Sequence, residues 1–179
     1  MSDSTADEKF YSGSYGLRDN RDTKALYAAW ANTYDAELTE EGYAQPVRAA
    51  AALAAIVPDR SARILDVRCG TGLSGKALID AGCRTVHGCD FSSEMLMKAE
   101  RLGVYKELFE ADLNEPLARI ADEVFDAVTA VGCFSFGHIS VDAIDELAGG
   151  GAIDVTSAER GEHMPGRDVY GWVITALKK

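Results

Sequence analysis

The sequence predicts a doubly wound α/β domain with a mostly parallel sheet and a carboxyl-terminal antiparallel hairpin. Between residues 64 and 148, short apolar runs typical of buried strands alternate with segments whose apolar residues recur at helical spacing. Short connections of this kind imply right-handed crossovers, parallel strands and helices on both faces of the sheet. After the glycines at 149–151, two strand-like segments follow without a helix between them. They indicate a hairpin that closes the sheet edge.

The amino-terminal part precedes this alternation. Residues 1–22 are polar and rich in Asp and Ser, which predicts a mobile arm. Apolar residues from Thr23 to Leu38 recur at helical spacing and predict a helix. Pro46 suits the first turn of a second helix, which continues over 47–57 until Pro58 ends it.

The remaining elements follow in strict order. Ser92 or Ser93 is the expected N-cap of the helix over 92–102, because a serine hydroxyl accepts a bond from a free N–H of the first turn. The other expected helices span 74–81 and 141–148, with a short turn or helix over 117–121. The expected strands span 64–67, 85–89, 108–111, 124–131, 152–157 and 169–177.

Composition excludes several classes of protein. A chain of 179 residues with 47% hydrophobic and 26% charged residues is expected to form one soluble globular domain. Its net charge of -11 opposes binding to a polyphosphate backbone, so nucleic acid is not expected as a partner. Neither a membrane-spanning run nor a signal peptide is recognisable, and a cytoplasmic location is expected.

The cysteines and histidines predict no metal site. The cysteines form no CxxC pair and have no histidine at ligand spacing, so small buried side chains are the expected interpretation for Cys69, Cys83, Cys89 and Cys133. His138 follows the apolar strand over 124–131 and could serve as a general base, but a surface imidazole is the favoured interpretation.

A glycine turn lies at the carboxyl end of the first predicted strand, where open α/β sheets bind ligands. Gly70 and Gly72 permit a tight turn and a close approach of a ligand to the backbone. The next strand ends at Asp90, about 18 residues after Gly72, near the spacing of roughly 20 expected for an acid that binds ribose hydroxyls. This pairing predicts a nucleoside-binding site.

The spacing also fits the GxGxxG pattern of dinucleotide oxidoreductases, and Asp66 argues against that alternative. A carboxylate beside the turn opposes a pyrophosphate but favours a ligand with ammonium and sulfonium charges. Asp112 ends the third strand, where it could accept a bond from an adenine amino group. Each acid alone could be a helix cap or a solvated strand end. Because the three acids lie at three consecutive strand ends, ligand binding is favoured over these structural roles.

The segment DVRCGTG resembles the signature of the class I S-adenosylmethionine-dependent methyltransferases, and the resemblance covers about residues 63–148. It implies a Rossmann-like methyltransferase fold, S-adenosylmethionine as the cofactor and S-adenosylhomocysteine as product. The acidic composition and the phenylalanine-bearing loop over 132–138 favour a small molecule as the methyl acceptor. Residues 27–35 are similar to the first helix of the subgroup named after the Williams-Beuren critical region, so 1–46 is expected to form an arm and lid helix and 47–179 the cofactor-binding core. The cofactor-binding residues implied are Tyr34, Asp66, Arg68, Gly70, Gly72, Asp90, Phe91, Met95, Asp112, Leu113 and Val131.

The chain departs from the family pattern in two places. Arg68 replaces the usual glycine, where its side chain could crowd the cofactor or reach its carboxylate. One strand and one helix are missing after residue 148, which should leave the strand over 124–131 without its outer neighbour. Either the hairpin moves inward to pair with that strand, or two chains form a homodimer along it. A catalytically impaired nucleotide-binding relative and, less favoured, a dinucleotide-dependent oxidoreductase remain as alternatives.

Overall fold

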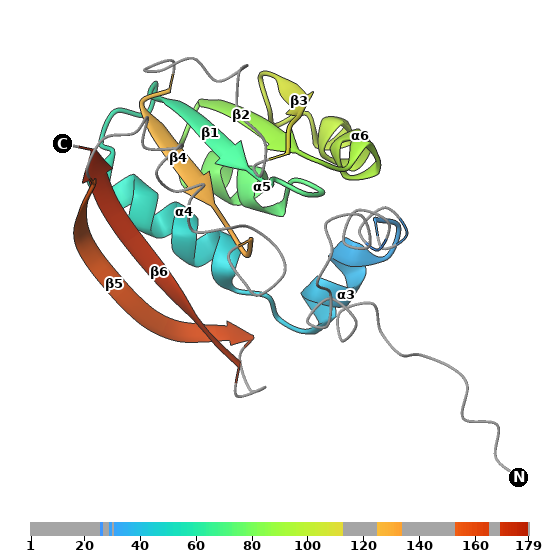
Figure 1. The fold of residues 1–179 in the computed structure, drawn as a ribbon, viewed down its shortest axis with the longest axis horizontal. Coiled ribbons are helices and arrows are strands. Elements are labelled where there is room, and N and C mark those ends of the chain that lie inside the picture. Colours follow the sequence, from blue (N-terminus) through green and yellow to red (C-terminus); the bar gives the residue numbers. More distant parts are fainter. Residues whose placement is uncertain are drawn as a thin grey trace, which may run out of the picture.

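A computed structural model describes residues 26, 29, 31–112, 125–133, 153–164 and 169–178. Figure 1 shows these residues as helices beside a twisted sheet, with a long hairpin alongside. The elements are α3 (Tyr34–Glu40), α4 (Gln45–Ile56), β1 (Arg63–Val67), α5 (Leu73–Asp80), β2 (Thr85–Asp90), α6 (Ser93–Leu102), β3 (Leu108–Glu110), β4 (Ala127–Ala130), β5 (Ile153–Met164) and β6 (Val169–Lys178).

The central sheet has the strand order β3-β2-β1-β4, and all of its pairings are parallel. Leu65 of β1 lies opposite His87 of β2 on one side and Val128 of β4 on the other. Because the strands are parallel, their carboxyl ends meet at one edge of the sheet. The predicted α/β class is confirmed, and this edge carries the glycine turn.

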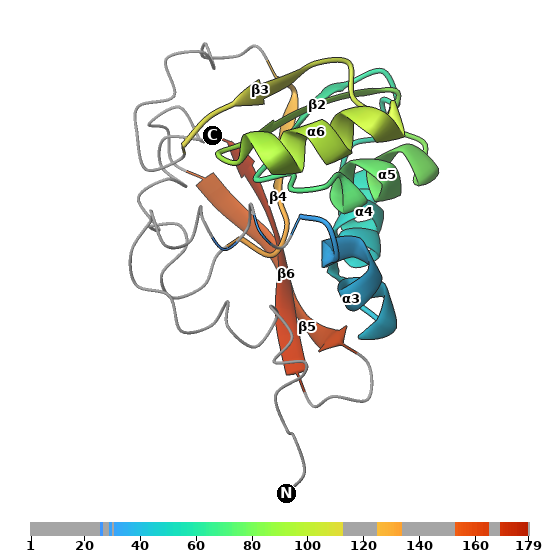
Figure 2. The same cartoon turned by 90° about the vertical axis from the view of Figure 1, so that its right-hand side faces the viewer.

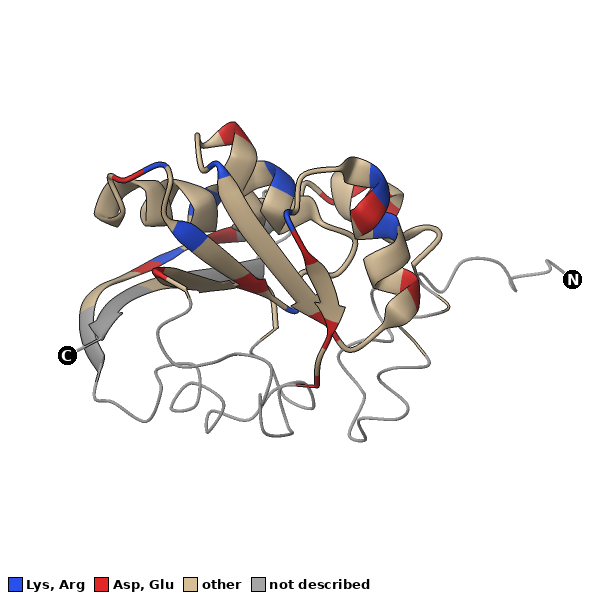
Figure 3. Cartoon of the chain, turned by 90° about the horizontal axis from the view of Figure 1, so that it is seen from above, with Lys and Arg blue, Asp and Glu red and all other residues tan. Residues whose placement is uncertain are grey.

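Helices α4, α5 and α6 lie together on one face of the sheet (Figures 2 and 3). Alternate residues of β1 divide between two apolar clusters, as the period of a strand requires. Ile64 packs with Val86, Leu53 and Leu78 beneath α4 and α5. The second cluster contains Leu65, Val67, Cys89, Phe109 and Cys133. The short turn or helix expected over 117–121 and the helix expected over 141–148 lie outside the described residues.

Local signals place the ends of these helices. Pro46 lies in the first turn of α4, as expected. Ser92 caps α6 by accepting a hydrogen bond from the Met95 N–H, and Gly103 ends the helix in the left-handed conformation that glycine adopts without steric cost.

The single helix expected from Thr23 to Leu38 is wrong. Leu26 and Ala29 have helical backbone, but residues 31–33 form a turn and α3 begins only at Tyr34. Ala31 and Leu38 are both buried, at 6% and 3% exposure. The turn interrupts the helical run while both residues stay buried, which helical spacing alone does not reveal.

The hairpin is confirmed as antiparallel, but the expectation that it closes the sheet edge is wrong. β5 and β6 form a separate two-stranded sheet. Arg48 of α4 donates a 3.2 Å hydrogen bond to the Glu159 carbonyl of β5, so the hairpin docks on a helix. In the described residues β4 pairs with β1 alone. The inward movement of the hairpin onto β4 is therefore contradicted.

The structure adds two further observations. β5 extends to Met164, well beyond the expected strand over 152–157, with irregularities in its register near Val155 and Glu162. Among the described residues, no helix is both long and apolar enough to cross a membrane.

Candidate functional site

The turn after β1 runs from Arg68 to Gly72 and leads directly into α5. Arg68, Gly70 and Gly72 have φ angles of 55°, 56° and 99°. Glycine adopts such angles without steric cost, whereas arginine does not. A Cβ placed on Gly70 would meet no described atom within 4 Å. The backbone at Gly70 is therefore open to the approach of a ligand.

Asp66 lies beneath this turn and is fully buried, at 0% exposure. Its Oδ2 accepts hydrogen bonds from the Ser74 hydroxyl at 2.6 Å and the Tyr105 hydroxyl at 2.8 Å, and its Oδ1 accepts one from Thr129 at 3.1 Å. Burial raises the pKa of Asp66 to about 6, although the three hydroxyl donors act in the opposite direction. These contacts join β1, α5 and β4, so the visible role of Asp66 is to hold the elements below the turn together.

Asp90 ends β2 and is also buried, at 4% exposure. Its Oδ2 accepts the backbone N–H of Gly70 at 3.0 Å, and its Oδ1 accepts that of Ser92 at 2.9 Å. Burial raises the pKa of Asp90, while these N–H groups and the nearby Arg68 lower it. The carboxylate thus ties the end of β2 to the glycine turn, the two features that the sequence pairs.

Arg68 places its guanidinium over the ring of Phe91, with Cζ 3.7 Å from the ring centroid. This distance is typical of a cation–π contact. Both terminal nitrogens, Nη1 and Nη2, are buried and have no hydrogen-bond partner in the described part of the chain. A buried guanidinium without acceptors is costly, so this side chain would gain from an anionic partner.

Tyr105 is a site residue that sequence reasoning missed. Its hydroxyl accepts the Gly75 N–H at 3.1 Å, besides donating to Asp66. A Cβ on Gly75 would come within 2.2 Å of the Tyr105 hydroxyl, and one on Gly88 within 2.9 Å of its ring. Glycines from α5 and β2 therefore form the niche that the tyrosine fills. The glycines were visible in the sequence, but their common neighbour was not.

Helix α3 meets the glycine turn through a hydrogen bond from the Thr71 hydroxyl to Oδ1 of Asp35. Thr71 is buried at 2% exposure, whereas Asp35 is only partly buried. The contact places Tyr34, the first residue of α3 and a predicted site residue, next to the residue that touches the turn. Sequence reasoning missed Asp35.

The other predicted residues are less closely joined to the turn. Met95 is buried at 1% exposure in the first turn of α6, Asp112 follows β3, and Val131 follows β4. Leu113 and His138 lie outside the described residues. All four cysteines are free and buried, as expected of small core side chains.

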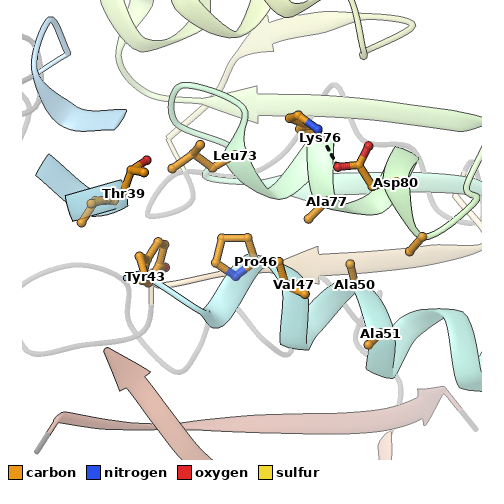
Figure 4. A pocket seen from close by; sticks show the side chains of 12 residues that line it. Thr39, Tyr43, Pro46, Val47, Ala50, Ala51, Leu73, Lys76, Ala77 and Asp80 are labelled. Carbon is orange, nitrogen blue, oxygen red and sulfur yellow. Dashed lines mark hydrogen bonds and ion pairs between the residues drawn. The ribbon is translucent and has the colours of Figure 1, made fainter. Parts of the chain in front are cut away.

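A cavity of about 370 Å³ lies between α3, α4 and α5. Its lining is mostly apolar and includes Tyr43, Pro46 and Leu73, with the Lys76–Asp80 ion pair at one end (Figure 4). No predicted cofactor-binding residue lines it. The candidate site is therefore defined by the strand ends and the turn, not by this cavity.

Comparison with known proteins shows the family of the chain. Residues 64–149 match the family described as a methyltransferase domain. Methyltransferase-like protein 27 of Homo sapiens is 33% identical over 170 residues, which cover 92% of this chain and 69% of that protein. The chain belongs to the class I S-adenosylmethionine-dependent methyltransferases.

Solved methyltransferases show the same fold. Magnesium protoporphyrin IX methyltransferase from Synechocystis PCC 6803 with bound S-adenosylhomocysteine superposes with a TM-score of 0.53 and 13% identity, over 95% of this chain and 93% of that one. The DhpI–S-adenosylhomocysteine complex gives a TM-score of 0.52 and 23% identity, over 87% and 78% of the two chains.

Membership of this methyltransferase family identifies S-adenosylmethionine as the cofactor and argues against the oxidoreductase alternative. The structure adds a physical reason. In a dinucleotide-binding turn, N–H groups at the start of the helix face a pyrophosphate. Here the Gly75 N–H is already bound by the Tyr105 hydroxyl, and Asp66 lies directly below.

Proposed function

We propose that this methyltransferase transfers a methyl group to a small-molecule acceptor in the cytoplasm, with its cofactor bound over the turn from Arg68 to Gly72. The observation that carries the site is the open approach to Gly70, whose N–H is held by the buried Asp90. The net charge of -11 argues against a nucleic-acid acceptor. In Figure 3 acidic and basic positions are interspersed over the described helices rather than gathered in one basic stripe. Four free cysteines are compatible with a reducing compartment.

The residues present suit an adenosine ligand with a charged methionyl group. The proposed contacts nearest the turn are Arg68, whose terminal nitrogens have no described hydrogen-bond partner, and Phe91, whose ring it covers. The remaining proposed contacts are Tyr34, Asp66, Gly70, Gly72, Asp90, Met95, Asp112, Leu113 and Val131. For Asp66 and Asp90, the described hydrogen bonds support a role in shaping the turn beside any contact with the ligand.

The reaction places modest demands on this chain. When bound, the cofactor supplies an electrophilic methyl group on a sulfonium ion, so its own chemistry provides the reactivity. The protein must bind and align the two reactants and exclude water. An acid/base pair is not required for such a displacement.

Calorimetry with S-adenosylhomocysteine, and with NAD as the comparison ligand, tests the proposed function. We expect binding of the former alone. Replacement of Asp90 by alanine should weaken that binding by about 1 to 3 kcal/mol, because a charge-assisted contact and the support of the Gly70 N–H are both lost. Because Asp90 is buried, the melting temperature of the variant should be measured as well, to show that it is folded. Absent binding by the native chain would contradict the proposal.

A second candidate function is binding of the cofactor without turnover. The strand and helix that the family pattern has after residue 148, and that this chain lacks, favour it, because their loss affects the acceptor side of the site and leaves the cofactor turn complete. Transfer of a labelled methyl group from S-adenosylmethionine to any acceptor in a small-molecule library would exclude this candidate. Binding without transfer would support it.

We also propose a homodimer through the outer edge of β4. In the described residues this edge pairs with no strand, and Val128 is 38% exposed. Exposed strand edges pair readily with a second chain. Analytical ultracentrifugation should detect a dimer that Val128→Lys weakens. A monomer at all concentrations would contradict the proposal.

A further inference from the structure

We propose that Asp35 is a cofactor-binding residue, whose Oδ1 holds α3 on the glycine turn and whose Oδ2 receives the ammonium group of the methionyl moiety. This inference rests on the proposed function. Its first support is the hydrogen bond from Thr71, which brings a carboxylate from α3 onto a turn that is distant in sequence. Thr71 lies between Gly70 and Gly72, so this carboxylate lies where a ligand would approach the backbone.

The second support comes from the other two acids at the site. Asp66 is fully buried and accepts hydrogen bonds from three hydroxyl groups. Both oxygens of Asp90 accept backbone N–H groups, and its exposure is 4%. Each of these carboxylates is therefore engaged by the protein itself.

Asp35 differs from both acids in its surroundings. It is partly exposed, and in the part of the chain that the structure describes its Oδ2 makes no hydrogen bond. It lies in the first turn of α3, where a negative charge is stabilised by the helix dipole. A carboxylate that is held by one oxygen, with the other oxygen free of hydrogen bonds, suits an ammonium group.

Arg68 complements this arrangement from the same turn. Its two terminal nitrogens have no described hydrogen-bond partner and would attract a carboxylate rather than an ammonium group. The glycine turn thus has a cation, Arg68, on one side and an anion, Asp35, that Thr71 holds on the other. This pair of charges matches a zwitterionic amino acid moiety. Asp35 would therefore bind the ammonium group of that moiety and not its carboxylate.

The test compares S-adenosylhomocysteine with its deamino analogue, which keeps the carboxylate and lacks the ammonium group. The native chain should prefer S-adenosylhomocysteine by about tenfold or more, as expected for a charge-assisted hydrogen bond. In Asp35→Asn this preference should fall to within about threefold, while the affinity for the deamino analogue changes little. Both dissociation constants are measured by calorimetry.

Two control variants separate binding from other effects. Thr71→Val removes the contact to Asp35 but keeps its carboxylate, so the preference for the ammonium group should persist even if both ligands bind more weakly. Asp80→Asn removes an equal charge at the far end of α5 and should leave both affinities unchanged.

The outcomes are distinct. A preference that persists in Asp35→Asn would overturn the proposal, as would an equal loss of both ligands, which would reduce Asp35 to holding α3. Loss of folding in both Asp35→Asn and Asp35→Ala would show a structural residue and likewise overturn it. If the native chain binds neither ligand, the proposed function fails, and this inference fails with it.

Discussion

The Tyr105 hydroxyl donates a 2.8 Å hydrogen bond to Oδ2 of Asp66 while accepting one of 3.1 Å from the Gly75 N–H. Gly75 lies in the first turn of α5, where backbone N–H groups have no partner within the helix. A single hydroxyl therefore satisfies a buried carboxylate and a helix end at the same time. The contact links the end of β1 to the start of α5, the two elements that flank the glycine turn.

Tyr105→Phe should destabilise the fold by about 1 to 3 kcal/mol, because the ring stays in its niche while a buried donor and acceptor lose their partner. The free energy of unfolding in urea checks this. Lys76→Ala is the control: it breaks the exposed ion pair with Asp80 on α5, the helix that contains Gly75, and should cost less than about 1 kcal/mol. Equal effects of the two variants would contradict the structural role of Tyr105.

Gly75→Ala should also destabilise the fold, by roughly 1 to 3 kcal/mol, because the new Cβ would lie 2.2 Å from the Tyr105 hydroxyl. In a helix alanine is otherwise favoured over glycine by about 0.8 to 1 kcal/mol. The sign of the effect should therefore reverse in a Tyr105→Leu background, where the clash is relieved. The free energies of unfolding of the native chain, the two single variants and the double variant form a double-mutant cycle. Additive effects would show that the two residues do not contact each other.

Asp66 should make the protein less stable as the pH rises. Burial raises its pKa from 3.8 to about 6, so between these values the folded state binds more protons than the unfolded state. Stability therefore falls as pH rises through this window, and the difference corresponds to roughly 3 kcal/mol. Asp66→Asn should lose this dependence.

Urea unfolding at pH 4, 5, 6 and 7 would measure the effect. The stability of the native chain relative to Asp66→Asn should decline across the series. Asp90, whose pKa burial also raises, acts in the same direction and is present in both proteins, so it largely cancels in the comparison. Parallel profiles for the two proteins would mean that Asp66 does not titrate in this range.

Arg68→Gly should bind S-adenosylhomocysteine more weakly, by about tenfold or more, because the cofactor carboxylate would lose a guanidinium whose terminal nitrogens have no other described hydrogen-bond partner. Glycine suits the φ of 55° at this position, so the fold itself should tolerate the change. Calorimetry against the native chain measures the change, with Arg63→Gly on the exposed start of β1 as the control. Tighter binding would show instead that Arg68 obstructs the cofactor by lying against Phe91. Unchanged affinity would show that it points away from the site.

Most of the alternating core could be predicted from the sequence because its signals are local. The strand at β1, the Pro46 start of α4 and the Ser92 cap of α6 each depend on residues within a few positions of one another. Periodicity and capping act over that range, so a sequence carries them without knowledge of the fold. The pairing of the glycine turn with Asp90 is of the same kind.

Tertiary structure alone decided where the charged groups point and what they contact. Asp66 follows Ile64 onto the face covered by α5 and meets Tyr105 and Thr129, which lie far away in sequence. The contact of Asp35 with Thr71 depends in the same way on a turn at 31–33 that helical spacing does not predict. The hairpin docks on α4 through Arg48 rather than extending the sheet. In each case the contact depends on packing between residues that are distant in sequence, and the local sequence pattern does not distinguish the observed partner from other possible ones.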